Sequence, residues 1–180
     1  MKGVLISIQP KWVEEICHKI GELNGKPIYK KRIEVRKGRP KEKLPIKCFI
    51  YEIYDKKYDG IGVCWEKGNI FEHACKKVIG EFVCDGIDEF IPSEYGVEAL
   101  HETSLTVKEM REYLQGKTGY GWHITDLKIY DKPKELSEFL IDCKNCGKKF
   151  VGAPNCWQGC VNGYRRLTRP PQSWCYVEEL

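Results

Sequence analysis

The sequence KRIEVR, residues 31–36, decides the interpretation of this chain. Apolar and charged side chains alternate along it, which is the pattern of a β-strand with one face turned to a hydrophobic core. We expect Ile33 and Val35 to face that core. The opposite face then carries two arginines and a carboxylate: Arg32, Glu34 and Arg36.

Further runs along the chain have the composition of strands. Aliphatic, β-branched and aromatic residues dominate the segments 4–8, 46–54, 78–84, 122–130 and 173–177. Short strands joined by long connections predict an α+β fold, a small β-barrel decorated with helices. A chain of 180 residues is long enough to bury one core, and we interpret residues 1–180 as a single domain.

Helices are predicted in the connections between these strands. An apolar stripe at helical spacing indicates a helix within residues 11–20, formed by Val13, Ile16, Cys17 and Ile20. Thr106 and Glu109 have the spacing of a capping box, and Gly116 is placed to end the helix that they begin. A further helix is predicted over residues 94–100.

Composition excludes several classes of protein. A net charge of +4 with 42% hydrophobic residues excludes a disordered chain. No apolar run approaches the roughly 18–20 residues that span a bilayer, so an integral membrane protein and a membrane partner are not expected. Residues 1–9 are too short for a secretory signal. We therefore expect a cytoplasmic protein with reduced thiols.

The ten cysteines divide into two groups. Six are isolated, and a lone thiol in an apolar run is most simply a small buried hydrophobe. The others have the spacing C-x2-C, nine residues, C-x3-C: Cys143, Cys146, Cys156 and Cys160. That spacing is typical of structural zinc, which would stabilise the glycine-rich segment 142–163. The alternatives are a loop with inert thiols or two local disulfides.

Basic residues are concentrated in one part of the chain. Between Lys26 and Lys47 there are ten basic and two acidic residues, a local charge of +8, so the rest carries −4 of the overall +4. Such a segment can steer a polyanion to one surface. A lysine-rich loop that serves only solubility is the alternative, and the charged face of residues 32–36 favours the polyanion.

The motif also carries a family resemblance. Lys31, Glu34 and Arg36 match the K-x-x-E-x-R core of the ASCH domain, and the chain resembles small bacterial and phage members of that PUA-like family. The similarity covers about residues 1–140 and 169–180, and three further stretches contribute to it: KVIGEFVCD at 77–85, YGWHITDLKIYDKPKEL at 120–136 and RPPQSWCYVEE at 169–179. Tyr29 stands where the family has glycine, and residues 142–163 are an insertion before the last strand.

The resemblance implies a PUA-like barrel with helices around a basic cleft that binds RNA or a modified nucleotide. Its nucleic-acid-binding residues would be Lys30, Arg32, Arg36, Trp122 and His123, with the last two stacking on a base beside Gly119 and Gly121. A core role for Trp122 and a structural role for His123 remain the alternatives.

A second implied function is hydrolysis, either as an amidohydrolase on acetylated cytidine or as a ribonuclease. Its catalytic residues would be Lys31, Glu34 and Glu102. Glu98 or His101 could replace Glu102, and the amidohydrolase branch has threonine where this chain has Glu34. Neighbouring cations lower the pKa of a lysine and make it a base or nucleophile, and a glutamate can activate water.

Two structural or binding interpretations stay open beside these. The Lys31–Glu34–Arg36 group could be a surface ion network that only orders the strand. The cysteine-rich segment could dock a protein partner.

Overall fold

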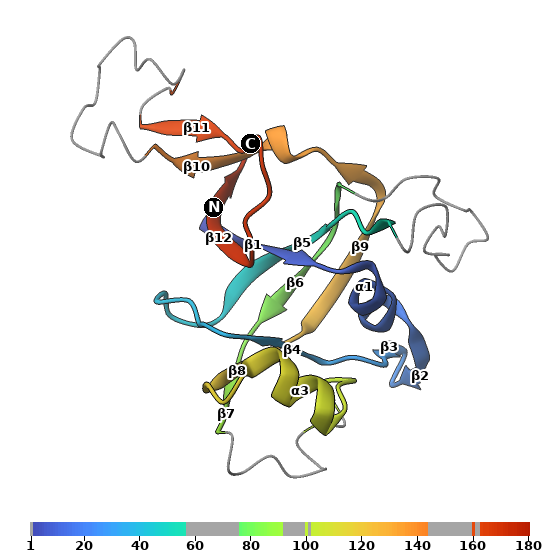
Figure 1. Ribbon diagram of the computed structural model, residues 1–180. Helices are drawn as coiled ribbons and strands as arrows, with labels where there is room; N and C mark the ends of the chain where they lie inside the picture. The colour runs from blue at the N-terminus through green and yellow to red at the C-terminus, as the bar shows by residue number, and fades with distance from the viewer. Residues whose placement is uncertain (1, 57–75, 92–99, 101, 144–159, 161–162) are drawn as a thin grey trace.

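The computed structural model describes residues 2–56, 76–91, 100, 102–143, 160 and 163–180. Two α-helices, one 3-10 turn and twelve strands lie in this part of the chain (Figure 1). In chain order they are β1 Lys2–Ile8, α1 Pro10–Cys17, β2 Lys19–Leu23, β3 Lys26–Tyr29, β4 Ile33–Arg36, β5 Ile46–Glu52, β6 Val78–Cys84, β7 Ile87–Phe90, α3 Val107–Leu114, β8 Gly119–His123, β9 Thr125–Lys134, η2 Leu136–Glu138, β10 Phe139–Asp142, β11 Tyr164–Arg166 and β12 Trp174–Glu179.

The main sheet has seven strands in the order β11-β10-β12-β1-β5-β6-β9. β1 and β5 are parallel and the other neighbours are antiparallel. Both faces of this sheet are covered, because Val4 and Ile6 pack in one apolar cluster and Leu5 in another. Neither helix in the described ranges is long and apolar enough to cross a bilayer.

The predicted closed barrel is wrong for the described residues. The two end strands of the main sheet, β11 and β9, are not paired with each other in the part of the chain that the structure describes. β4, which carries the charged motif, instead forms a separate three-stranded sheet in the order β4-β8-β7. Alternation along a strand determines which face is buried, but it does not determine which strand pairs with which.

The three-stranded sheet packs against α3, and Ile33 and Val35 face this core as their alternation predicted. Ile33 and Val35 are buried in a cluster with Met110 and Leu114 of the helix. The predicted capping box at the start of α3 is confirmed. The Thr106 hydroxyl accepts a hydrogen bond from the N–H of Glu109, and the Glu109 carboxylate accepts one from the N–H of Thr106.

The first helix is shorter than its apolar stripe predicted. Val13 and Ile16 are buried, but α1 ends at Cys17 and Ile20 is 60% exposed on β2. β2 and β3 form a hairpin whose turn contains Asn24 and Gly25, both with positive φ. Asn-Gly is the dipeptide that favours a two-residue hairpin turn, and it overrides the helical spacing that extended to Ile20.

One of the other predicted strands is divided. The run 122–130 contains the end of β8 and most of β9, separated at Ile124. The predicted helix over 94–100 lies outside the described residues, apart from Leu100 at its end.

Candidate functional site

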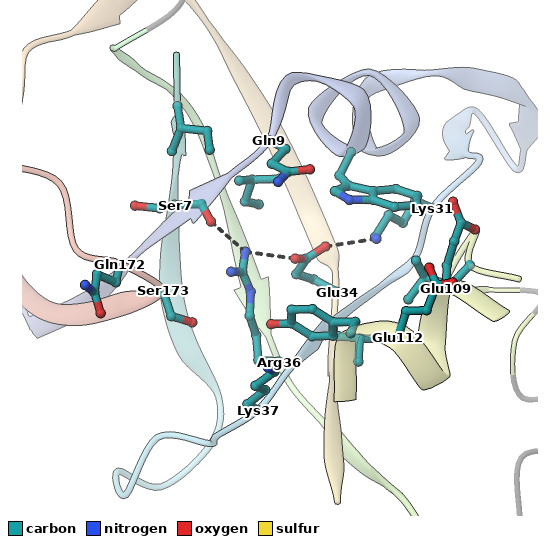
Figure 2. A pocket seen from close by; sticks show the side chains of 16 residues that line it. Ser7, Gln9, Lys31, Glu34, Arg36, Lys37, Glu109, Glu112, Gln172 and Ser173 are labelled. Atoms are coloured by element: carbon teal, nitrogen blue, oxygen red, sulfur yellow. Dashed lines mark hydrogen bonds and ion pairs between the residues drawn. The ribbon is translucent and has the colours of Figure 1, made fainter. Parts of the chain in front are cut away.

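A cavity of about 750 Å³ lies over the charged face of β4 (Figure 2). Its walls come from the end of β1, from α1, from β4, from α3 and from the segment before β12. The described residues that line it are Ser7, Ile8, Gln9, Trp12, Lys31, Glu34, Val35, Arg36, Lys37, Ile53, Leu105, Glu109, Glu112, Tyr113, Gln172 and Ser173. Elements far apart in the sequence therefore converge on the K-x-x-E-x-R strand.

The floor of the cavity is a buried row of charges. Lys31 Nζ lies 3.0 Å from Glu34 Oε2, and an Arg36 guanidinium nitrogen (Nη2) lies 2.8 Å from Glu34 Oε1. The three residues are only 2%, 5% and 6% exposed, in the order Lys31, Glu34 and Arg36. The same Arg36 nitrogen donates a hydrogen bond to the Ser7 carbonyl at 3.0 Å, and Figure 2 shows the resulting chain of contacts from Ser7 to Lys31. This group is therefore not a surface ion network.

Glu34 stays ionised between its two basic neighbours. Burial acts to raise the pKa of the Glu34 carboxyl, but the Lys31 ammonium and the Arg36 guanidinium together outweigh it and lower that pKa. The pair Lys31–Glu34 is thus a buried ion pair, and such a pair is retained only where its partners are well placed.

Some hydrogen-bond donors of Arg36 and Lys31 have no acceptor in the protein among the described residues. Arg36 Nε is buried and has no hydrogen-bond partner among the described residues. Lys31 has three N–H donors, and its ammonium contacts one carboxylate and lies 4.5 Å from the centre of the Trp12 ring. A buried donor without an acceptor costs free energy. A ligand that offers carbonyl oxygens to Arg36 and Lys31 would remove that cost.

The rim of the cavity is formed partly by α3. Lys11 of α1 pairs with Glu109 at 2.7 Å and so links the two helices. Hydrogen bonds from Lys11 and from the N–H of Thr106 lower the pKa of Glu109 to about 2. Glu112 lines the cavity one turn further along the same helix. Two carboxylates of α3 therefore line the same cavity as the row of charges on β4.

The charges around the cavity are balanced. Three basic and three acidic residues line it: Lys31, Arg36, Lys37, Glu34, Glu109 and Glu112. The predicted basic cleft is therefore not confirmed for the described lining. A site with balanced charge suits a neutral ligand that hydrogen-bonds, and it is less suited to a chain of phosphates.

Two aromatic side chains line the cavity. Trp12 stands on α1 and Tyr113 on α3. Burial raises the pKa of the Tyr113 hydroxyl, partly offset by the nearby Arg36. Lys37 Nζ lies 5.1 Å from the centre of the Tyr113 ring. No spacing in the chain relates Trp12 to Tyr113, so neither was predicted as a site residue.

The predicted basic residues at the start of the motif lie outside this lining. Lys30 pairs with Glu15 at 2.7 Å on the surface. Arg32 pairs with Glu102, and both side chains are exposed. Glu102 also holds the backbone of the strand, since its carbonyl accepts hydrogen bonds from the N–H groups at positions 32 and 33. Lys31, Glu34 and Arg36 meet in the cavity, whereas Glu102 is turned to Arg32.

Trp122 and His123 also lie away from the described lining. Trp122 is fully buried, its ring centre is 5.5 Å from that of Trp174, and its Nε1 donates to the Gly38 carbonyl at 3.1 Å. His123 Nε2 lies 3.0 Å from an Asp88 carboxylate oxygen. Trp122 is paired with Glu34 across β8 and β4, so it supports the strand from within the core. The alternative carboxylate and imidazole, Glu98 and His101, lie outside the described residues.

The ends of the cysteine-rich segment lie beside each other. β10 and β11 pair antiparallel, and the N–H of Cys143 donates to the Gly163 carbonyl at 2.7 Å. Cys143 and Cys160 are both buried. Cys146 and Cys156 lie outside the described residues, and no group of three possible metal ligands occurs among the residues that are described.

The fold is that of the ASCH domain, as the motif implied. The chain is similar to the crystal structure of the ASCH protein from Zymomonas mobilis, with a TM-score of 0.57 and 18% sequence identity, over 98% of this chain and 87% of that chain. A tyrosine-to-phenylalanine mutant of the same protein gives a TM-score of 0.57 and 17% identity, over 99% of this chain and 91% of that chain. No family model and no curated protein matches the sequence. At this identity the similarity establishes the fold alone.

Proposed function

We propose that this protein binds a base of RNA, or of a modified nucleotide, in the cavity over β4. The observation that carries the proposal is the pair of buried cations, Lys31 and Arg36, that line the cavity on either side of Glu34, with Arg36 Nε left without a partner among the described residues. A nucleobase presents oxo groups and ring nitrogens as acceptors, so it can take up donors that the protein itself leaves unused.

Size, charge and aromatic content support the same ligand. Ligand cavities commonly measure about 300–1,000 Å³, and this one measures about 750 Å³. Its balanced lining suits an uncharged base. The rings of Trp12 and Tyr113 are surfaces on which an unstacked base can pack. The carboxamides of Gln9 and Gln172 offer both a donor and an acceptor to the edge of a base.

Calorimetric titration with the four ribonucleosides and with acetylated cytidine tests the proposal. Tyr113→Ala should weaken the tightest of them about 5- to 150-fold, because stacking on an aromatic ring contributes about 1–3 kcal/mol per base. Tyr54→Ala is the matched control. Tyr54 is 44% exposed against 37% for Tyr113, and a lysine lies over its ring as well, but it does not line the cavity. Equal effects of the two variants, or no binding of any probe, would count against the proposal.

A second candidate function is hydrolysis of an acyl group on such a base. The observation that favours it is a pair of carboxylates, Glu109 and Glu112, lining the cavity that contains Lys31. Glu109 is engaged by Lys11 and by the helix cap, so Glu112 is the better candidate to activate water. Glu112 would take a proton from water as it adds to the acyl carbonyl, and Lys31 would stabilise the oxyanion. Glu112 would then return that proton to the nitrogen as the C–N bond breaks, leaving the amine and the acid.

Turnover of acetylated cytidine by the purified protein tests this second function. Glu112→Gln should abolish turnover and leave the affinity for the deacetylated nucleoside within a few fold. Lack of turnover by the wild-type protein would exclude it and leave binding alone.

We further propose that Cys143, Cys146, Cys156 and Cys160 hold a structural zinc ion. Support comes from the donor set and from the burial of Cys143 and Cys160 at the base of the insertion. Four thiolates fill the coordination shell of Zn²⁺, which makes such a site structural rather than catalytic.

A further inference from the structure

The loop between β4 and β5, residues 37–45, adjoins the cavity and is strongly basic. We call it the basic loop. Its first residue, Lys37, lines the cavity. Four basic side chains and one carboxylate follow along it: Lys37, Arg39, Lys41, Lys43 and Glu42. The basic loop therefore places positive side chains beside a cavity whose own lining has equal numbers of basic and acidic residues.

Core side chains hold the backbone of the basic loop in place. Trp122 Nε1 donates to the Gly38 carbonyl at 3.1 Å, and the N–H of Lys41 donates to the Tyr176 hydroxyl at 2.7 Å. Pro40, between these two anchors, is buried. Trp174 packs on both Trp122 and Tyr176, with ring centres 5.5 Å apart in each of the two contacts. The loop is thus a fixed support with exposed lysines, which differs from a mobile solubility loop.

Three of the four cations of the basic loop have no carboxylate partner among the described residues. Arg39 pairs with Glu89 at 3.2 Å. Lys37, Lys41 and Lys43 are exposed, and no carboxylate lies within 4.0 Å of their ammonium groups in the described part of the chain. The basic residues of the segment 30–36 behave differently, since each one is paired with a glutamate: Lys30, Lys31, Arg32 and Arg36.

We propose that the basic loop binds the phosphates of the nucleotides that flank the base in the cavity. The ligand is then a single-stranded polynucleotide, and a free nucleoside occupies only half of the site. This inference rests on the proposed function, because it takes the cavity as the place of the base. Single-strand binders commonly combine a basic track for the backbone with rings for the bases, and here the two parts are divided between the loop and the cavity.

The dependence of RNA binding on salt tests the inference. The probe is a fluorescein-labelled single-stranded RNA of mixed sequence and about ten nucleotides, within the site sizes of single-strand binders. Each lysine–phosphate contact on a single strand contributes about 0.7 to the slope of log K against log salt. The double variant Lys41→Ala/Lys43→Ala should therefore have a slope shallower by about 1.4.

Lys128→Ala/Lys132→Ala is the control, because it removes the same charge from exposed positions on β9. Its slope should match that of the wild-type protein. Equal slopes for the two double variants would overturn the inference, and so would a wild-type slope near zero. If nucleosides still bind in either case, the proposed function stands and only the loop is excluded. If neither nucleosides nor RNA bind, both proposals fail.

Discussion

Replacing Glu34 by glutamine tests the buried row of charges at its centre. The substitution keeps the shape of the side chain and removes the charge that faces both Lys31 and Arg36. Two cations that are 2% and 6% exposed then lack a counterion. Removing one partner from a buried ion pair costs about 3–5 kcal/mol. Since about 1 kcal/mol lowers the melting temperature of a domain of this size by about 2–4 °C, we expect a decrease of about 6–20 °C.

Circular dichroism measures both quantities, the melting temperature in thermal unfolding and the free energy of unfolding in urea. The control is Glu89→Gln, which breaks the Arg39–Glu89 pair at 3.2 Å between two half-exposed side chains. Exposed pairs contribute about 0–1 kcal/mol, so this variant should differ little from the wild-type protein. If Glu34→Gln costs no more than the control, the row of charges is not buried in solution and the reasoning fails.

A triple substitution separates stability from function. Replacing the whole row with apolar residues, as in Lys31→Met/Glu34→Leu/Arg36→Met, removes the charges together and leaves none unpaired. Replacement of a buried ionic group in this way is often neutral or stabilising. We therefore expect near wild-type stability and loss of nucleoside binding. Binding that survives the triple substitution would show that the row is structural only.

Two further predictions concern the rim and the insertion. At pH values above about 4.3, the usual pKa of glutamate, Glu109→Gln should lower the free energy of unfolding by about 1 kcal/mol. Other losses of a helix cap have a similar effect. The pKa of Glu109 is lowered to about 2 in the folded protein, so its contribution to stability is lost as the pH falls from about 4.3 to about 2. The free energies of unfolding of the two proteins, measured in urea titrations, should therefore converge near pH 2. A difference that stays constant over this pH range would contradict the prediction. For the insertion, elemental analysis should find one zinc ion per chain, and Cys143→Ser and Cys160→Ser should each lose it. A fully folded, metal-free protein with four titrating thiols in the segment 142–163 would refute the zinc site.

The parts of the fold that the sequence predicted correctly have local signals. The alternation in residues 31–36 predicted the buried face of β4, because successive side chains of a strand point to opposite sides. Arg32, predicted on the charged face, precedes β4 and pairs with Glu102 instead. The capping box at Thr106 is equally local, since its two hydrogen bonds span three residues. The end of α1 was misplaced because the stripe through Ile20 was given more weight than Asn24 and Gly25, whose turn chemistry was available in the sequence.

The rest of the site depends on tertiary packing. Lys31, Glu34 and Arg36 lie within six residues, so the motif alone identified them. Trp12 and Tyr113 reach the cavity from α1 and α3, and no spacing in the chain relates these helices. Trp122 was misjudged for a related reason, because a large ring beside glycines looks the same in sequence whether it lines a cleft or, as here, is buried on Trp174. The prediction of a closed barrel was wrong because strand pairing depends on contacts between residues far apart in the chain, which the local pattern does not reveal.

A structure of the protein with a bound nucleoside or short RNA tests the central claim most directly. The proposal predicts a base in the cavity, with an oxygen or ring nitrogen within hydrogen-bond distance of Arg36 Nε and the Lys31 ammonium. A base bound on the outer surface at Lys30 and Arg32, with the cavity empty, would contradict it.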